Sequence, residues 1–203
     1  LLGGAEQMAA ISLEMTFVAL LFLLITTGLL IADLKQPKRF LYILLRPQWK
    51  SWLVRGAWFL VVFGLLLTGW CIAQLLSVTA LADFLLWPTA ALAIPTAVYT
   101  AFLFAQAKGR DLWQNPLLSV HLLAHALLAG GAVWLMIGGL ASDVDMAVPR
   151  TFTLVMLCLS STTVMGELLT THPTEDARRA MAMIIGRPLG VWFWGGIVFG
   201  YVV

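Results

Sequence analysis

Charged side chains are scarce in this chain. Asp, Glu, Lys and Arg make up 11% of its 203 residues, whereas 61% of the residues are hydrophobic and the mean hydropathy is +0.94. A soluble globular domain carries about 25% charged residues. This composition therefore excludes an ordinary soluble protein and predicts an integral membrane protein.

Cysteine and histidine are almost as rare, with two and three residues respectively. Cys71 and Cys158 each stand alone in an apolar run and form no CxxC pair. A structural zinc site or an iron–sulfur cluster held by this chain is therefore not expected. The sequence also has no phosphate-binding loop, nucleophile elbow or nucleic-acid-binding patch, so we expect no nucleic-acid partner.

Long apolar runs take up most of the chain. Because about 20 residues of helix cross the hydrocarbon layer, these runs predict an all-α, polytopic transmembrane helix bundle. We expect residues 1–203 to form one transmembrane domain, truncated at both ends, of a protein with eight or more spans. Six spans are expected, at 8–32, 53–82, 84–107, 116–141, 149–171 and from 188 onward.

The basic residues are distributed unevenly. Half of the twelve Lys and Arg residues lie in Asp33–Trp58, between the first two expected spans. Of the remaining six, only Arg150 falls at the opposite membrane surface. The positive-inside rule therefore places the loop at 33–58 and the other basic loops in the cytoplasm, unless a docked partner on that face overrides it.

Two connectors have apolar residues at helical spacing. The segment 37–47 carries Phe40, Leu41, Leu44 and Leu45, and the segment 172–188 carries a similar stripe. This pattern predicts short amphipathic helices at the membrane surface.

Ionisable groups within spans are costly in a bilayer, so they are candidate functional residues. His121 and His125 are four residues apart and share one helix face. Three interpretations of the pair stay open: hydrogen bonds to a neighbouring helix, contact with a quinone together with proton transfer, and binding of a metal or haem. Tyr99 lies deep in its span, four residues after Pro95, and is either a ligand contact or an anchor.

Two carboxylates are candidates for a proton relay. Glu14 lies well inside the first expected span, far from any surface that its side chain can reach. Glu167 lies one turn from the basic end of its span, so structural and relay roles are equally open for it.

Three ordered segments resemble the NrfD/PsrC-type (polysulfide reductase-type) membrane subunits. They are DLKQPKRF with SWLVRGAW, then YTAFLFAQAKGRDLWQNP, then HPTEDARRAMAMIIGRPLGVWFWGGIVFG. The resemblance covers nearly the whole chain. The second segment departs from the family pattern because Thr100 and Ala101 follow Tyr99 where the family has an early glycine.

The resemblance implies a haem-free, quinone-binding subunit (menaquinone or ubiquinone) in the bacterial cytoplasmic membrane. Such a subunit exchanges electrons with an iron–sulfur subunit, which serves a molybdopterin-type or cytochrome-containing catalytic arm. The family's tyrosine contact with quinone carries over to Tyr99, whereas the histidines match no family motif. The expected docking residues for the partner are Asp33, Lys38, Arg39, Arg46 and Arg55.

The sequence thus predicts a quinone-binding membrane subunit of a respiratory oxidoreductase, and a second hypothesis adds proton translocation. It would support the quinone half-reaction without itself carrying the catalytic arm. A purely structural anchor, a b-type cytochrome-like subunit and a transporter subunit are the alternatives.

Overall fold

The computed structural model describes residues 2–34, 40–107, 114–140, 145–170, 174–186 and 189–201. Within these ranges the chain is helical and contains no strand, as the composition predicts. The helices are α1 (Leu2–Ala32), α2 (Phe40–Leu45), α3 (Trp52–Leu75), α4 (Thr79–Ala105), α5 (Leu117–Leu140), α6 (Ala147–Leu169), α7 (Glu175–Ile185) and α8 (Gly190–Tyr201).

Five of these helices are long and apolar enough to cross a membrane: α1, α3, α4, α5 and α6. The first five expected spans are therefore confirmed. The sixth is different, because α8 has only 12 residues and qualifies only together with α7, from which it is bent by 67°. The C-terminal part is thus a bent helix pair, and the described residues contain five or six candidate spans.

The turn between the second and third spans comes earlier than expected. We expected it near Asp83, but α3 ends at Leu75 and α4 begins at Thr79. Ser77 makes the reversal with φ of 56°, a left-handed conformation that is uncommon for a residue other than glycine. Residues 71–82 contain no charged residue, glycine or proline, so the sequence pattern did not locate this turn. As a result, Asp83 lies inside α4.

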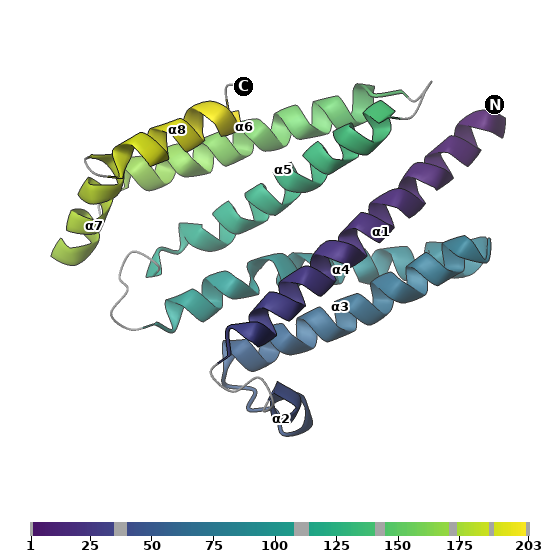
Figure 1. The fold of residues 1–203 in the computed structure, drawn as a ribbon, viewed down its shortest axis with the longest axis horizontal. Coiled ribbons are helices and arrows are strands. Elements are labelled where there is room, and N and C mark those ends of the chain that lie inside the picture. The colour runs from purple at the N-terminus through teal and green to yellow at the C-terminus, as the bar shows by residue number, and fades with distance from the viewer. Residues whose placement is uncertain are drawn as a thin grey trace.

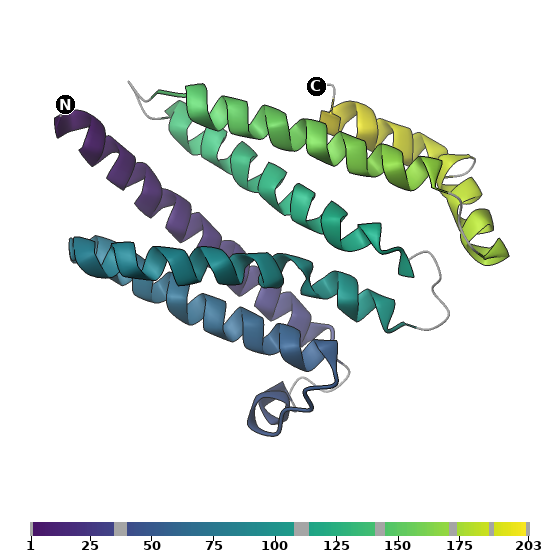
Figure 2. The same cartoon turned by 180° about the vertical axis from the view of Figure 1, so that it is seen from behind.

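The bundle consists of two antiparallel helix pairs joined by α4 and α5 (Figures 1 and 2). In one pair α3 packs along α4, and in the other α5 packs along α6. Helix α1 packs against α3 and also touches α5. Several buried side chains of the bundle are small, including Ala57, Ala73 and Ala124, which let the helices approach closely. Large apolar side chains such as Leu140 and Phe199 point outward, as lipid-facing residues do.

Both amphipathic connectors form helices, as predicted. Helix α2 lies beside the start of α3. The N-cap residue of α7 is Thr174, whose hydroxyl oxygen accepts a hydrogen bond from the Ala177 N–H at 3.3 Å. The acidic side chains in the first turn of α7, Glu175 and Asp176, interact favourably with the positive end of its helix dipole.

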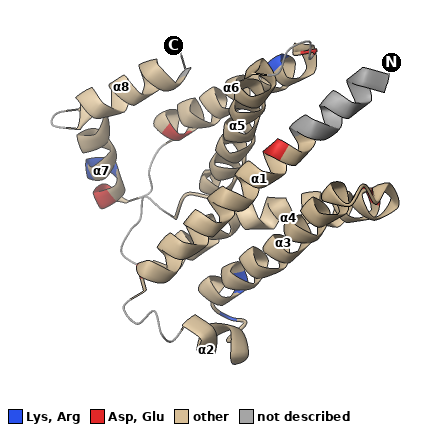
Figure 3. Cartoon of the chain, turned by 45° about the vertical axis from the view of Figure 1, so that its right-hand side comes forward, with Lys and Arg blue, Asp and Glu red and all other residues tan. Residues whose placement is uncertain are grey.

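The two connector helices lie at the same end of the bundle (Figures 1 and 3). We call this the basic end; its described basic residues are Arg46, Lys50, Arg55, Arg178 and Arg179. Arg150 lies at the other end, in the first turn of α6.

Candidate functional site

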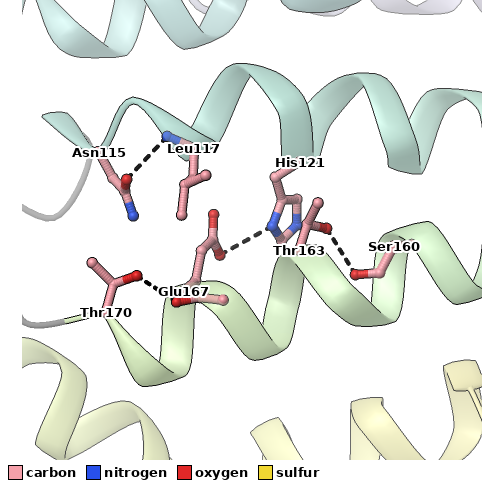
Figure 4. A network of polar contacts seen from close by, with 8 residues as sticks. Asn115, Leu117, His121, Ser160, Thr163, Glu167 and Thr170 are labelled. Carbon is pink, nitrogen blue, oxygen red and sulfur yellow. Dashed lines mark hydrogen bonds and ion pairs between the residues drawn. The ribbon is translucent and has the colours of Figure 1, made fainter.

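Helices α5 and α6 bring a histidine and a carboxylate together near the basic end. They are antiparallel neighbours, so the start of α5 lies beside the end of α6. His121 is one turn into α5, and Glu167 is in the last turn of α6. Nδ1 of His121 lies 3.0 Å from Oε2 of Glu167, and both side chains are about one-fifth exposed, at 19% and 22% (Figure 4).

The contact between these two groups is an ion pair by distance. Nδ1 of His121 is buried, and within the described part of the chain no group makes an aligned hydrogen bond to it. A buried polar atom in this situation is stabilised by any ligand or water that supplies the missing partner. The imidazole is therefore held next to a carboxylate and retains hydrogen-bonding capacity.

His125 extends this polar cluster one turn deeper into the membrane. The His121 and His125 rings have centroids 4.1 Å apart and are tilted by 55°. The spacing of four residues predicted a shared helix face, and the structure confirms it.

A cavity of about 490 Å³ opens beside these three groups. Its volume is within the range of small-molecule sites. Most of its wall is apolar, and the polar groups His121, His125, Glu167 and Asn115 sit along one side. The remaining lining residues are Leu118, Val164, Leu168, Met181, Ile184, Trp192, Phe193, Gly196 and Ile197.

The bent helix pair supplies one wall of this cavity. Met181 and Ile184 come from α7, and Trp192 and Phe193 come from α8. The apolar stripe predicted on α7 is thus turned toward the bundle, and it includes the buried Ala177. Asn115 also lines the cavity. Its Oδ1 accepts a hydrogen bond from the Leu117 N–H at 3.0 Å and so caps the start of α5.

Tyr99 is buried elsewhere, between α3 and α4. Tyr99 is 4% exposed and packs against Gly56, where a Cβ atom would come within 2.1 Å of Cδ2 of the ring. Tyr99 is not among the residues that line the cavity beside the histidines. Tyr99 and the histidine pair, which are all candidate quinone contacts, therefore do not line the same cavity.

A scan against protein families matches residues 5–203 to the family described as polysulphide reductase, NrfD. The chain belongs to the NrfD family. Members are membrane subunits of quinone-interacting oxidoreductase complexes. A search of curated proteins and a search of solved structures each found no match.

In this NrfD-family chain the described docking candidates differ in how firmly they are held. Asp33 and Arg46 are exposed near the basic end. Arg55 is fixed by local contacts: its Nε donates to the Trp49 carbonyl oxygen at 2.6 Å, and its guanidinium lies 4.7 Å from the centre of the Trp52 ring. Lys38 and Arg39 lie outside the described residues.

The first residue of α3, Trp52, contacts α4 next to Arg55. The Trp52 ring stacks on Phe102 with centroids 4.4 Å apart, and the Trp52 N–H donates to Oε1 of Gln106 at 3.2 Å. Phe102 follows Tyr99 by three residues, nearly one helical turn. A rigid aromatic contact thus joins the docking candidate Arg55 to the region of Tyr99.

Glu14 is exposed on α1 and does not line the cavity. Its neighbours Ser12 and Thr16 face α3 and contact Gln74. Because Glu14 is two residues from each, it points away from that polar contact. Its role as a proton relay stays a prediction.

The sequence interpretation did not predict the direct contact of His121 with Glu167 or the contribution of α8 to the cavity. The first had a detectable signal, since both residues lie close to the same membrane surface on consecutive spans. The second had none, because Trp192 and Phe193 look like ordinary lipid-facing aromatics in sequence. The described residues contain no group of three or more His, Cys, Asp or Glu side chains that could hold a metal ion.

Proposed function

We propose that this chain is the quinone-binding membrane subunit of a bacterial respiratory oxidoreductase. The observation that carries the proposal is the cluster of His121, His125 and Glu167 on the wall of an apolar cavity of about 490 Å³. The NrfD family membership supports the same function.

The cavity suits the chemistry of a quinone. An isoprenoid quinone combines a long apolar tail with two carbonyl oxygens, and its two-electron reduction takes up two protons. The apolar side chains from α5, α6, α7 and α8 provide a wall for the ring and the start of the tail. Imidazole N–H groups of His121 and His125 donate hydrogen bonds to the carbonyl oxygens and orient the ring.

Glu167 has a separate role in this proposal. Its carboxylate oxygen lies 3.0 Å from Nδ1 of His121, close enough to take a proton from that ring or to return one to it. His121 and Glu167 thereby hold and pass protons at the cavity wall. Tyr99 is a second candidate contact, and it rests on the family resemblance alone.

The proposed electron partner is an iron–sulfur subunit docked on the basic end, itself attached to a molybdopterin-type or cytochrome-containing arm. The cavity lies beneath this end, where α7 and the start of α5 are located. A partner docked at the basic end would bring its iron–sulfur cluster close to a quinone in this cavity, and electron transfer is faster over a shorter distance. The quinone itself is menaquinone or ubiquinone, and the membrane is the bacterial cytoplasmic membrane.

The test compares His125→Ala and Tyr99→Phe in the intact complex. Loss of one hydrogen bond costs about 1 kcal/mol, which is roughly five-fold in binding. We expect His125→Ala to weaken binding of a quinone analogue by at least that factor and to lower the amount of quinone that copurifies. Tyr99→Phe should show a similar loss only if Tyr99 belongs to the site.

A matched control for His125→Ala is Val120→Ala on the same helix, since Val120 is 47% exposed and faces outward. It should bind quinone like the wild type. If both test variants keep wild-type binding and quinone-linked turnover, the site is elsewhere. A purely structural anchor predicts that no quinone copurifies and that quinone-site inhibitors have no effect.

A further inference from the structure

The titratable side chains around the cavity are distributed toward one end of the bundle. In α5 the only ones are His121 and His125, both in the first nine residues of the helix. From His125 to Leu140 the helix continues for about 22 Å at 1.5 Å per residue without another titratable side chain. Glu167, in contrast, is only about 3 Å along the axis from the last residue of α6.

The hydroxyl groups of α6 do not extend the polar cluster toward the opposite end. Between Arg150 and Glu167 this helix carries one cysteine and several Ser and Thr residues. Most of these hydroxyls donate to carbonyl oxygens three or four residues earlier in the same helix. The donors are Thr151, Thr153, Ser161, Thr162 and Thr163, at 2.7–2.9 Å. Their protons are engaged locally, as is usual for hydroxyls in helices.

Helices α1 and α4, which also pack against α5, add three acidic residues and a phenol. Helix α4 carries Asp83 near its start and the buried Tyr99, and α1 carries Glu6 and Glu14. Asp83, Tyr99 and Glu14 do not line the cavity. Among the described residues, the polar lining of the cavity therefore consists of His125, His121, Glu167 and Asn115.

We propose that protons enter and leave the quinone cavity through the His121–Glu167 pair, on the side of the membrane that carries the basic end. His125 and His121 contact the ring oxygens, Glu167 exchanges protons with His121, and Asn115 lies beside them at the start of α5. The inference rests on the proposed function and adds the side on which protons are exchanged.

The stoichiometry is simple. Oxidation of one quinol to the quinone breaks two O–H bonds, sends two electrons to the iron–sulfur partner and releases two protons. Reduction takes up the same numbers in reverse. Because the electron partner is proposed to dock on the same face, electrons and protons would leave the cavity toward one compartment.

The experiment uses the intact complex in sealed proteoliposomes of known orientation, with one pH-sensitive dye trapped inside and an impermeant one outside. A short-chain quinol is added with an electron acceptor that serves the iron–sulfur partner. We expect two protons per quinol to appear first on the side of the basic end. Glu167→Gln should slow this appearance by roughly ten-fold or more, and Glu167→Asp should restore part of the rate.

Thr162→Val is the matched control, since Thr162 is exposed on the same helix and bonds only its own backbone. It should release protons at the wild-type rate. The inference is overturned if protons appear first on the opposite side. It is also overturned if Glu167→Gln leaves the rate unchanged while the complex still binds quinone. Loss of quinone binding in the wild-type complex would instead reject the proposed function. The wild-type measurement of sidedness needs no variant and remains decisive if Glu167→Gln fails to assemble.

Discussion

Gly56 is the residue on which the position of Tyr99 depends. The ring lies so close to the α3 backbone that a Cβ at residue 56 would come within 2.1 Å of Cδ2 and 2.2 Å of Cε2. Real Cβ atoms do not approach other atoms so closely, and an aromatic ring is too rigid to yield at one edge. The absence of a side chain at Gly56 therefore permits the burial of Tyr99, whatever the phenol contacts.

We predict that Gly56→Ala destabilises the α3–α4 pair by about 1–3 kcal/mol, the usual cost of overpacking. The measurement is the thermal unfolding midpoint of the purified complex in detergent. Gly130→Ala is the control, because a Cβ at Gly130 would meet nothing within 4 Å. Equal midpoints for the two variants would show that Tyr99 moves aside without cost.

Hydrogen bonds between side chains hold helix α1 against helix α3. The Ser12 hydroxyl donates to Oε1 of Gln74 at 3.0 Å, and Nε2 of Gln74 donates to the Thr16 hydroxyl oxygen at 3.3 Å. Thr16 is only 1% exposed and donates in turn to the Ser12 carbonyl oxygen. All three polar side chains are thus satisfied between two otherwise apolar helices. Helices α7 and α8 instead present apolar side chains to the cavity, among them Met181, Ile184, Trp192 and Phe193.

A double-mutant cycle of Ser12→Ala with Gln74→Leu should show coupling between α1 and α3. Hydrogen bonds between membrane helices average about 0.6 kcal/mol and reach about 1.7 kcal/mol, so we expect a coupling energy within that range. Unfolding of the purified complex in detergent provides the measurement. As a control, Ser12→Ala with Thr68→Val should be additive, because Thr68 bonds only the Gly64 carbonyl oxygen of its own helix.

The uneven distribution of charge orients the whole molecule. Among the described basic residues, Arg150 alone lies at the end opposite α2 and α7. Basic loops stay in the cytoplasm during insertion, so the basic end should face the cytoplasm unless partner docking reverses this preference. The same end holds the candidate cavity and the exposed docking candidates, which makes its compartment important for electron and proton transfer.

Cysteine labelling tests this orientation in intact cells. In a background with Cys71 and Cys158 replaced by Ala, Lys50→Cys should resist an impermeant maleimide until the membrane is opened. Asp145→Cys, at the other end and exposed, should react without opening. The reverse pattern would place the basic end outside the cytoplasm and contradict the positive-inside prediction.

The sequence by itself determined the helical membrane fold, five of the spans, the amphipathic connectors and the basic end. It could do so because hydropathy, helix periodicity and charge distribution are local properties of the sequence, and they govern how helices form and insert in a bilayer. It also singled out Tyr99, His121, His125 and Glu167, since ionisable groups are conspicuous in an apolar span. The early turn at Ser77 escaped because no charged residue, glycine or proline marked it.

Only the tertiary structure decided which of these candidate residues line the same cavity. The antiparallel packing of α5 and α6 placed Glu167 3.0 Å from His121, whereas Tyr99 was buried against Gly56 on another helix pair. The bend between α7 and α8 brought Trp192 and Phe193 to the cavity wall. Helix packing depends on how surfaces many residues apart fit together, and one-dimensional patterns do not contain that information.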